Sequence, residues 1–340
     1  MHSKQKAALV CCAMILALMF SDLIRQSVHN SLILSVQVLI PSLYPSFVLS
    51  GMLLDFGLHT LLPPPIASFI ISLICGYPLG TRTVCNYYIE GNLNFDQANT
   101  LLMCTANASP AFIVVAVGNT IMGNQHFGYQ LLISQILSSV LIFFFNVPDK
   151  LKFSTKKISS VSLGTSLIEN IRSSAQQLLF VCSCTMFFGI LFDALCQTKL
   201  INYSIFLVLI SSIELTHGIG SIDNTSIYTV AFILGFSGIA ILIQCIYFMQ
   251  KTDLSIRHLI IGKLLYAFNM PCIISLFYSP TFHKIITISI IILTNSAVTC
   301  IMRCKGCEKD YDFFKRYRKM LRILRARNKN NHEGASSLPT

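Results

Sequence analysis

Ile71-Ser-Leu-Ile-Cys-Gly-Tyr-Pro-Leu-Gly80 is the stretch that decides the fold, and it recurs in weaker form as Ser211-Ser-Ile-Glu-Leu-Thr-His-Gly-Ile-Gly220, about 140 residues later. In both copies an apolar half-helix runs into a glycine-rich break. Lipid offers no partner for the backbone groups that such a break frees, so the break must be buried in protein or line a cavity. Two such segments at matching places in two halves indicate a transporter-type central site.

The composition excludes a large soluble domain. The 340-residue chain is 54% hydrophobic and only 11% charged, whereas soluble domains are roughly 25% charged, and its mean hydropathy is +0.66. The sequence therefore predicts an all-α polytopic membrane protein. Its 13 cysteines lie mostly inside apolar runs, which is typical of buried, reduced thiols. We expect no metal site and no cofactor.

The lengths of the apolar runs predict eight transmembrane helices and two re-entrant segments. The re-entrant segments are the runs 66–75 and 205–215, which at about ten residues cross half a bilayer. Two of the spans are broken, one at Asn107-Ala-Ser-Pro110 and one at Phe236-Ser-Gly238. The eight spans are 7–21, 31–54, 98–118, 128–147, 174–196, 228–249, 258–278 and 283–302.

Charge gives the orientation. With both termini in the cytosol, ten Lys and Arg residues before residue 303 fall in inside loops and three in outside loops, as the positive-inside rule requires. We expect a multi-pass protein of the bacterial cell membrane. Residues 308–329 alternate aromatic and apolar with basic side chains, which predicts an amphipathic helix on anionic lipid head groups. No nucleic-acid-reading module is present, so nucleic acid is not an expected partner.

The two halves align as an inverted-topology repeat. Asn30 and Gln37 match Asn170 and Gln177 at an offset of 140, and Gly51-x-x-x-Asp55 matches a second Gly-x-x-x-Asp 138 residues later. Three crossings in each half give the halves opposite orientations. The predicted units are a peripheral helix (1–26), the first repeat (27–147), a basic cytosolic linker (148–166), the second repeat (167–280), a second peripheral helix (281–302) and a cytosolic tail (303–340).

Five motifs in order carry a family resemblance: Pro41-Ser-Leu-Tyr-Pro-Ser-Phe-Val-Leu-Ser50, Gly76-Tyr-Pro-Leu-Gly80, Asn107-Ala-Ser-Pro-Ala-Phe112, Glu214-Leu-Thr-His-Gly218 and Phe236-Ser-Gly238. Over residues 27–280 the chain resembles the YlbJ-type sporulation integral membrane proteins of the nucleoside-recognition (Gate) superfamily. The resemblance implies an endospore-forming bacterium, a role in development of the spore cortex, and a fold similar to that of concentrative nucleoside transporters.

The four interruptions are expected at one depth, which predicts one central polar pocket. The candidate ligand-binding residues are Gly76, Tyr77, Pro78, Gly80, Asn107, Ser109, Pro110, Glu214, Thr216, Gly218, Ser237 and Gly238. Six of them are expected to line the pocket: Tyr77, Asn107, Ser109, Glu214, Thr216 and Ser237.

Glu214 is the strongest of these candidates, because a carboxylate within a membrane is costly unless it serves a cavity or a partner. The alternative is that it accepts hydrogen bonds from backbone amides freed at the break. His217 beside Glu214 suggests a metal pair, but no third ligand is near, so a polar residue of the tip is the simpler interpretation. Arg82 either neutralises an anionic group of a solute or marks the cytosolic exit.

Two functions fit this pattern. The first is a permease for a small polar solute, nucleoside-like or anionic. The second is a structural or scaffolding membrane protein of sporulation that keeps the fold without the flux. No nucleophile and base stand together in the sequence, so we do not expect an enzyme and assign no catalytic residue. The identity of the solute and the formation of a homo-oligomer stay open.

Overall fold

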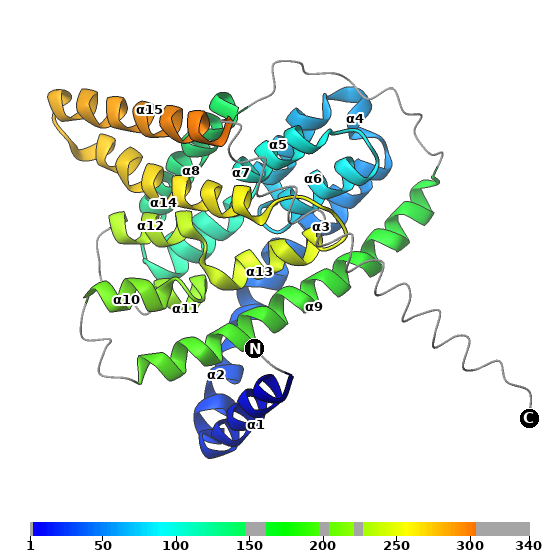
Figure 1. Cartoon of the computed structure of the whole chain (residues 1–340), viewed down its shortest axis with the longest axis vertical. Helices are drawn as coiled ribbons and strands as arrows, with labels where there is room; N and C mark the ends of the chain where they lie inside the picture. The colour runs from blue at the N-terminus through cyan, green and yellow to red at the C-terminus, as the bar shows by residue number, and fades with distance from the viewer. Residues whose placement is uncertain (1–2, 147–160, 198–203, 221–226, 304–340) are drawn as a thin grey trace, which may run out of the picture.

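The chain folds into helices throughout the part that the structure, a computed structural model, describes: residues 3–146, 161–197, 204–220 and 227–303 (Figure 1). The predicted tail helix at 308–329 and most of the linker at 148–166 lie outside these ranges. The helices of the N-terminal half are α1 (Ser3–Met19), α2 (Ser21–Leu34), the π-helix η1 (Ser35–Leu39), α3 (Ile40–Asp55), α4 (Leu58–Leu61), α5 (Pro64–Cys75), α6 (Leu79–Ile89), α7 (Phe95–Cys104), the π-helix η2 (Phe112–Ile121) and α8 (Gln125–Asn146).

The C-terminal half repeats this order of long and short helices. Its elements are α9 (Leu163–Cys196), α10 (Ser204–Ser211), α11 (Leu215–Gly220), α12 (Ile227–Phe236), α13 (Gly238–Met249), α14 (Ile256–Tyr278) and α15 (Thr281–Arg303). Each half thus has one long helix, two short helices around a tip, two short helices around a break, and one unbroken helix of 22 or 23 residues.

Six helices in the described part are long and apolar enough to cross a membrane: Ser21–Asp55, Gln125–Asn146, Leu163–Cys196, Ile227–Met249, Ile256–Tyr278 and Thr281–Met302. The chain is therefore a polytopic helical membrane protein. The eight predicted spans are not all of this kind. The run 7–21 forms α1, which has 17 residues, and the run 98–118 is divided between α7 and η2.

Two helices are longer than the hydropathy of the sequence predicts. Helices α2, η1 and α3 form one continuous apolar helix of 35 residues, and α9 has 34. The unit boundaries expected at residues 26 and 166 therefore both fall inside helices. The added turns carry a few polar side chains that are buried in the protein, although most of their polar side chains are exposed. Among the buried ones, Ser27 and Ser166 are each 1% exposed.

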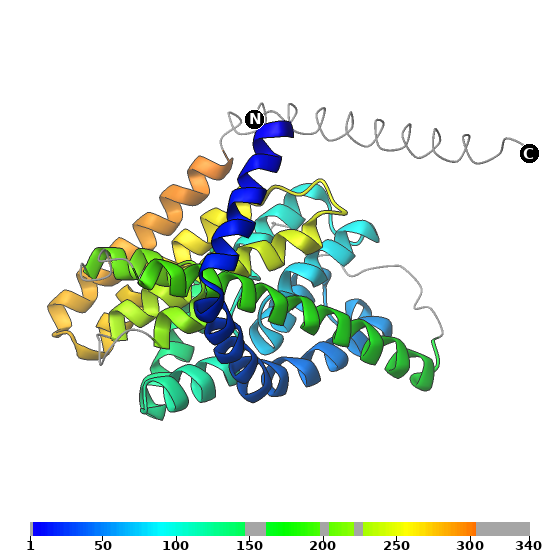
Figure 2. The same cartoon turned by 90° about the horizontal axis from the view of Figure 1, so that it is seen from below.

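These two long helices lie alongside each other (Figure 2). Their contacts run antiparallel, because Gly51 of α3 faces Asn170, near the start of α9, and Gly189 faces Ser31 of α2. Glycines at these two contacts allow the two backbones to approach closely, as is common between helices in membranes.

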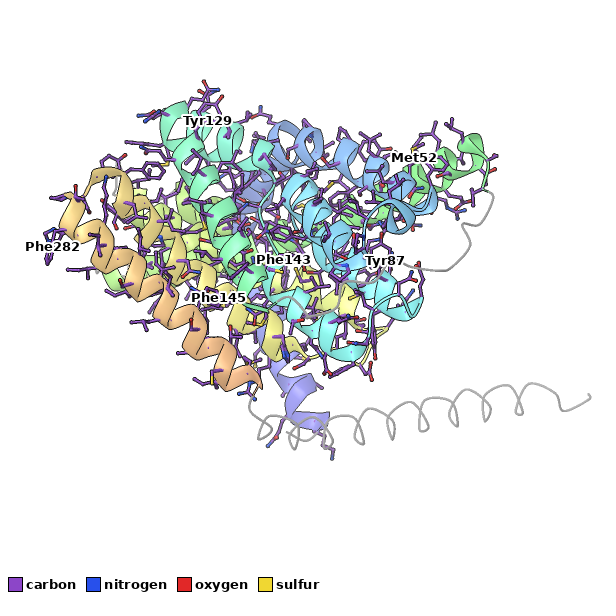
Figure 3. All side chains as sticks on the ribbon, turned by 90° about the horizontal axis from the view of Figure 1, so that it is seen from above. Met52, Tyr87, Tyr129, Phe143, Phe145 and Phe282 are labelled. Atoms are coloured by element: carbon purple, nitrogen blue, oxygen red, sulfur yellow. The ribbon has the colours of Figure 1, made fainter. Side chains whose placement is uncertain are left out.

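The outer surface is apolar and suited to lipid. Figure 3 shows Tyr129 on α8 and Phe282 on α15 pointing away from the helix bundle, and these side chains are 49% and 71% exposed. Helix α15 is the most peripheral of the six long apolar helices, since only 17% of its apolar window is buried against 56% for α14. It packs against α14 and α8.

Candidate functional site

The first tip lies directly on the first break. Gly76 ends α5 with a φ of +76°, and a Cβ at this position would lie 2.5 Å from the backbone nitrogen of Ser109. The next residue, Tyr77, donates its backbone N–H to the carbonyl oxygen of Asn107 at 2.5 Å. Gly80 approaches even more closely, because a Cβ there would lie 1.9 Å from the carbonyl oxygen of Thr105. Because Gly76 and Gly80 have no side chain, the first tip can contact the backbone of the first break.

The second tip meets the second break in the same way. The carbonyl oxygens of Ser212 and Ile213 accept hydrogen bonds from the backbone N–H groups of Ile239 and Ala240, at 2.9 and 3.1 Å. The break itself is made by two residues in the left-handed region, Ser237 with φ +67° and Gly238 with φ +80°. A left-handed serine costs free energy and persists where the surrounding structure holds it. Each half therefore pairs its own tip with its own break.

Side chains of the protein satisfy much of the first break. Gln135 of α8 bonds both backbone groups of Ala108, each at 2.9 Å. Asn107 donates to the carbonyl oxygen of Cys104 at 3.0 Å and to Ser72 Oγ at 3.3 Å, and it accepts from Ser139 Oγ at 3.2 Å. Asn107 therefore has the contacts of a residue that supports the break.

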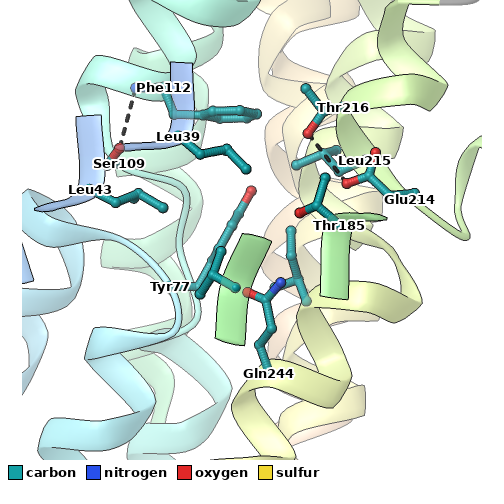
Figure 4. A pocket seen from close by; sticks show the side chains of 12 residues that line it. Leu39, Leu43, Tyr77, Ser109, Phe112, Thr185, Glu214, Leu215, Thr216 and Gln244 are labelled. Carbon is teal, nitrogen blue, oxygen red and sulfur yellow. Dashed lines mark hydrogen bonds between the residues drawn. The ribbon is translucent and has the colours of Figure 1, made fainter. Parts of the chain in front are cut away.

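A small cavity lies between the two tip-and-break pairs and the two long helices (Figure 4). Its volume is about 30 Å³, room for about two water molecules. The polar residues that line it are Tyr77, Ser109, Thr185, Glu214, Thr216 and Gln244, and the apolar ones are Leu39, Leu43, Phe112, Val181, Leu215 and Ile241.

Tyr77 contributes an unusual group to this cavity. Its side chain is 9% exposed, and its hydroxyl finds no hydrogen-bond partner among the described residues. Figure 4 shows the hydroxyl pointing into the space between Phe112 on one side and Thr216 on the other. A buried hydroxyl without a partner costs roughly 1–3 kcal/mol, which makes it a candidate contact for a bound solute or water.

Glu214 stands on the opposite wall and is 2% exposed. Its Oε2 accepts hydrogen bonds from the backbone N–H of His217 at 2.7 Å and lies 2.9 Å from His217 Nδ1. Its Oε1 accepts from Thr216 Oγ1 at 3.3 Å. The carboxylate thus caps the start of α11, as the structural alternative requires, and also faces the cavity.

His217 extends this chain of polar groups to the other half of the protein. Its Nε2 lies 3.3 Å from Ser31 Oγ on α2, and the side chain is 12% exposed. A proton on His217 would make an ion pair with Glu214. No group of three or more His, Cys, Asp or Glu residues that could hold a metal occurs among the described residues.

Lys263 is the central residue that the sequence analysis missed. It lies within α14 and is 1% exposed. Its ammonium bonds the carbonyl oxygen of Ala106 in the first break and Ser237 Oγ in the second, the latter at 2.6 Å. It also lies 5.1 Å from the centre of the Tyr77 ring. The sequence did contain a signal for this residue, because Lys263 lies inside an apolar run. Lysines are rare in membrane spans and tend to be functional there.

The structure brings four of the six predicted lining residues to the cavity: Tyr77, Ser109, Glu214 and Thr216. The other two, Asn107 and Ser237, are buried at the breaks and do not line it. Of the remaining candidates, Gly76, Pro78, Gly80, Pro110, Gly218 and Gly238 form the backbone of the tips and breaks. Thr185 and Gln244 were missed because they stand in parts of helices that the sequence reads as unbroken.

Arg82 does not line the cavity. Its Nη1 donates to Gln177 Oε1 of α9 at 2.8 Å, so it links the helix after the first tip to the long helix of the other half. Close by on the same helix, Asn170 and Ser166 donate to Asp55 Oδ2 at 2.7 and 2.8 Å. These contacts form a polar cluster between the halves, away from the cavity.

Comparison with known proteins gives one distant likeness. The sporulation integral membrane protein YlbJ of Bacillus subtilis (strain 168) is 22% identical over an alignment of 307 residues, which covers 72% of this chain and 75% of YlbJ. No family model matches the chain, and no solved structure matches it.

Proposed function

We propose that this chain is an integral membrane protein of sporulation that carries a small polar solute, nucleoside-like or anionic, across the bacterial cell membrane. The observation that carries the proposal is the cavity between the two tips and breaks, with the free hydroxyl of Tyr77 on one wall and the Glu214 carboxylate on the other. The name of the distant relative supports the role in sporulation, as does the resemblance of the five motifs quoted above to those of the YlbJ-type sporulation proteins.

The cavity is small in this state. Its volume of about 30 Å³ holds about two waters, whereas pockets for small organic molecules measure about 300–1,000 Å³. A solute can therefore bind only after the tips and breaks have moved apart. Paired broken helices are suited to such movement, because each half can rock against the other around a fixed site.

The proposal includes an inverted-topology repeat of residues 27–147 and 167–280. Reciprocal packing of the two long helices supports it: Gly51 lies on Asn170, and Gly189 lies on Ser31. It also includes eight crossings, re-entrant arms formed by α5 and α10, and both termini in the cytosol.

Labelling of single cysteines from either side of the membrane tests this topology. A label placed at residue 157 should react from the same side as labels near both termini, and labelling of the two termini from opposite sides would exclude the topology.

The functional test uses Glu214. Glu214→Gln removes the charge and keeps the shape, so it should fold and abolish solute movement if the carboxylate acts by charge or proton exchange. Glu214→Leu should misfold, because the His217 amide loses its acceptor. The measurement is an untargeted comparison of small molecules in spores or membrane vesicles with and without each variant. Full activity of Glu214→Gln would make the carboxylate a structural acceptor only.

The alternative is a structural membrane protein without flux. The contacts of Gln135 and Asn107 favour it, because they satisfy the first break without any solute. In that case substitutions around the cavity should be mild, and the tail and linker should carry the function. We propose no enzymatic activity for either case.

A further inference from the structure

Lys263 occupies the joint between the two breaks. One oxygen that it contacts, the carbonyl of Ala106, belongs to the first half, and the other, Ser237 Oγ, belongs to the second. Ser237 uses its own proton to donate to the carbonyl oxygen of Leu234 at 3.0 Å, so its oxygen is free to accept from the lysine. One ammonium group therefore ties together two breaks that are about 130 residues apart in the sequence.

The groups around this ammonium are formally neutral. In the described part of the chain no carboxylate forms an ion pair with Lys263. The titratable groups that face it are the thiol of Cys245 on α13 and the rings of Tyr77 and Tyr266, whose centres lie 5.1 and 5.9 Å from Nζ. Glu214, which is paired with His217, lies across the cavity from Tyr77 (Figure 4).

Such a site stabilises a cation through dipoles and ring faces alone. Hydrogen bonds from a charged donor are roughly twice as strong as neutral ones, so the protonated lysine holds the two breaks together more firmly than the free amine would. A fully buried charge without an opposite charge is also costly. The charge on Lys263 therefore strengthens the joint and at the same time carries a desolvation cost.

We propose that Lys263 is a proton-binding site, and that loss of its proton loosens the joint between the two breaks and allows the cavity to open. The ammonium gives up one proton to water that enters the cavity and becomes a neutral amine, and proton uptake from the other side restores the joint. This inference rests on the proposed function, for which it names the proton as the coupling ion. Tyr77 covers the lysine on the side of the cavity, so its ring would have to move when water reaches Nζ.

The test is amide hydrogen exchange of the full-length protein in lipid nanodiscs, followed across a series of pH values and corrected for the chemical exchange rate. The informative amides are those of Tyr77 and Ala108 in the first half and of Ile239 and Ala240 in the second, because their hydrogen bonds hold the tips and breaks in place. In the wild-type protein their exchange should rise several-fold through one transition as the pH increases.

Lys263→Met cannot bind the proton, so its break amides should exchange fast at every pH and show no transition. Lys263→Gln is the second variant in case the first does not fold, and it should also lack the transition. Lys251→Met is the matched control, since Lys251 is exposed in the turn after α13, and it should behave like the wild type.

Three results of the exchange measurement would overturn the proposal: no transition in the wild type, an unchanged transition in the folded Lys263 variants, or loss of the transition in Glu214→Gln with the lysine intact. The exchange measurement needs no solute, so it separates this proposal from the permease. If the transition occurs in a protein that moves no solute, the permease proposal is wrong and the proton-site proposal stands. Solute flux that persists in Lys263→Met would remove the proton site and keep the permease.

Discussion

Gly51 of α3 lies directly against the side chain of Asn170 on α9, so closely that a Cβ at position 51 would be 1.8 Å from Asn170 Oδ1. Asn170 cannot easily withdraw, because its Nδ2 donates to Asp55 Oδ2 at 2.7 Å and to the carbonyl oxygen of Ser166 at 2.8 Å. The close approach of the two long helices therefore depends on a glycine on one helix and a fixed amide on the other.

Gly51→Ala should destabilise the protein by about 1–3 kcal/mol, the usual cost of overpacking. The measurement is the thermal unfolding midpoint in detergent. Gly164→Ala is the control: Gly164 lies at the exposed start of α9, with no atom of the described part of the chain within 4 Å of its Cβ position, so alanine should be neutral or stabilise by up to about 1 kcal/mol.

A double variant checks that the clash is with Asn170. Gly51→Ala combined with Asn170→Ala should lose less stability than the sum of the two single changes, since the second change removes the atom that the new methyl group meets. Additive losses would show that the glycine is needed for another reason.

Tyr77 and Tyr266 give a second, opposite pair of predictions. Tyr77→Phe removes a buried hydroxyl without a partner, so stability should stay the same or rise by about 1 kcal/mol, while solute movement should fall. Tyr266→Phe removes a hydroxyl that lies 2.9 Å from the carbonyl oxygen of Cys104 and 2.8 Å from Ser139 Oγ, and it should cost about 1–2 kcal/mol. Unfolding midpoints of both variants provide the measurement. Equal destabilisation by the two changes would mean that the Tyr77 hydroxyl has a partner within the fold.

The class of protein and the places where helices end could be predicted from the sequence, because apolar run length and glycine-rich breaks report directly on backbone behaviour in lipid. The ends of α5 at Gly76 and of α12 before Ser237 are examples. The starts of the two long helices could not be predicted from hydropathy, because their first turns are rich in polar side chains, most of which are exposed.

The residue-by-residue correspondence between the two halves also could not be predicted from the sequence. Matching identical residues pairs Asn30 with Asn170 and Gln37 with Gln177, yet Asn30 and Gln37 are exposed, whereas Asn170 and Gln177 are buried. In the structure Ser31 faces Gly189 in the way that Asn170 faces Gly51. Ser31, and not Asn30, therefore occupies the position that corresponds to Asn170. Which side chains of a helix are buried depends on which of them contact the partner helix. A match of residue types that is off by one position does not reveal this.

The tail gives a prediction that does not depend on the described residues. A peptide of residues 308–329 should be unfolded in buffer and on neutral vesicles and become helical on vesicles that contain anionic lipid, because its basic side chains need anionic head groups and its aromatic face needs the interface. Circular dichroism measures this. In the whole protein, deletion of residues 308–340 should change core stability by less than about 0.5 kcal/mol, and a larger loss would mean that the tail packs against the bundle.

The last prediction concerns Gly80, Gly218 and Gly220 of the two tips. These glycines look equivalent in the sequence, but their surroundings in the structure differ. A Cβ at Gly80 would lie 1.9 Å from the carbonyl oxygen of Thr105, and one at Gly218 would lie 2.5 Å from the carbonyl oxygen of Ser211. At Gly220 no atom of the described residues lies within 4 Å of the same position. Backbone atoms cannot rotate away as a side chain can, so relief at Gly80 requires the tip to separate from its break.

Gly80→Ala and Gly218→Ala should therefore each lower the unfolding midpoint by an amount that corresponds to about 1–3 kcal/mol or more, and amide exchange at the neighbouring break should rise. Gly220→Ala should keep the midpoint and the exchange of the wild type, although the sequence aligns Gly220 with Gly80 at the same offset of 140 that joins the two tips. If Gly220→Ala instead proves as damaging as Gly80→Ala, the second tip packs more closely than its contacts here indicate, and the two tips are equivalent after all.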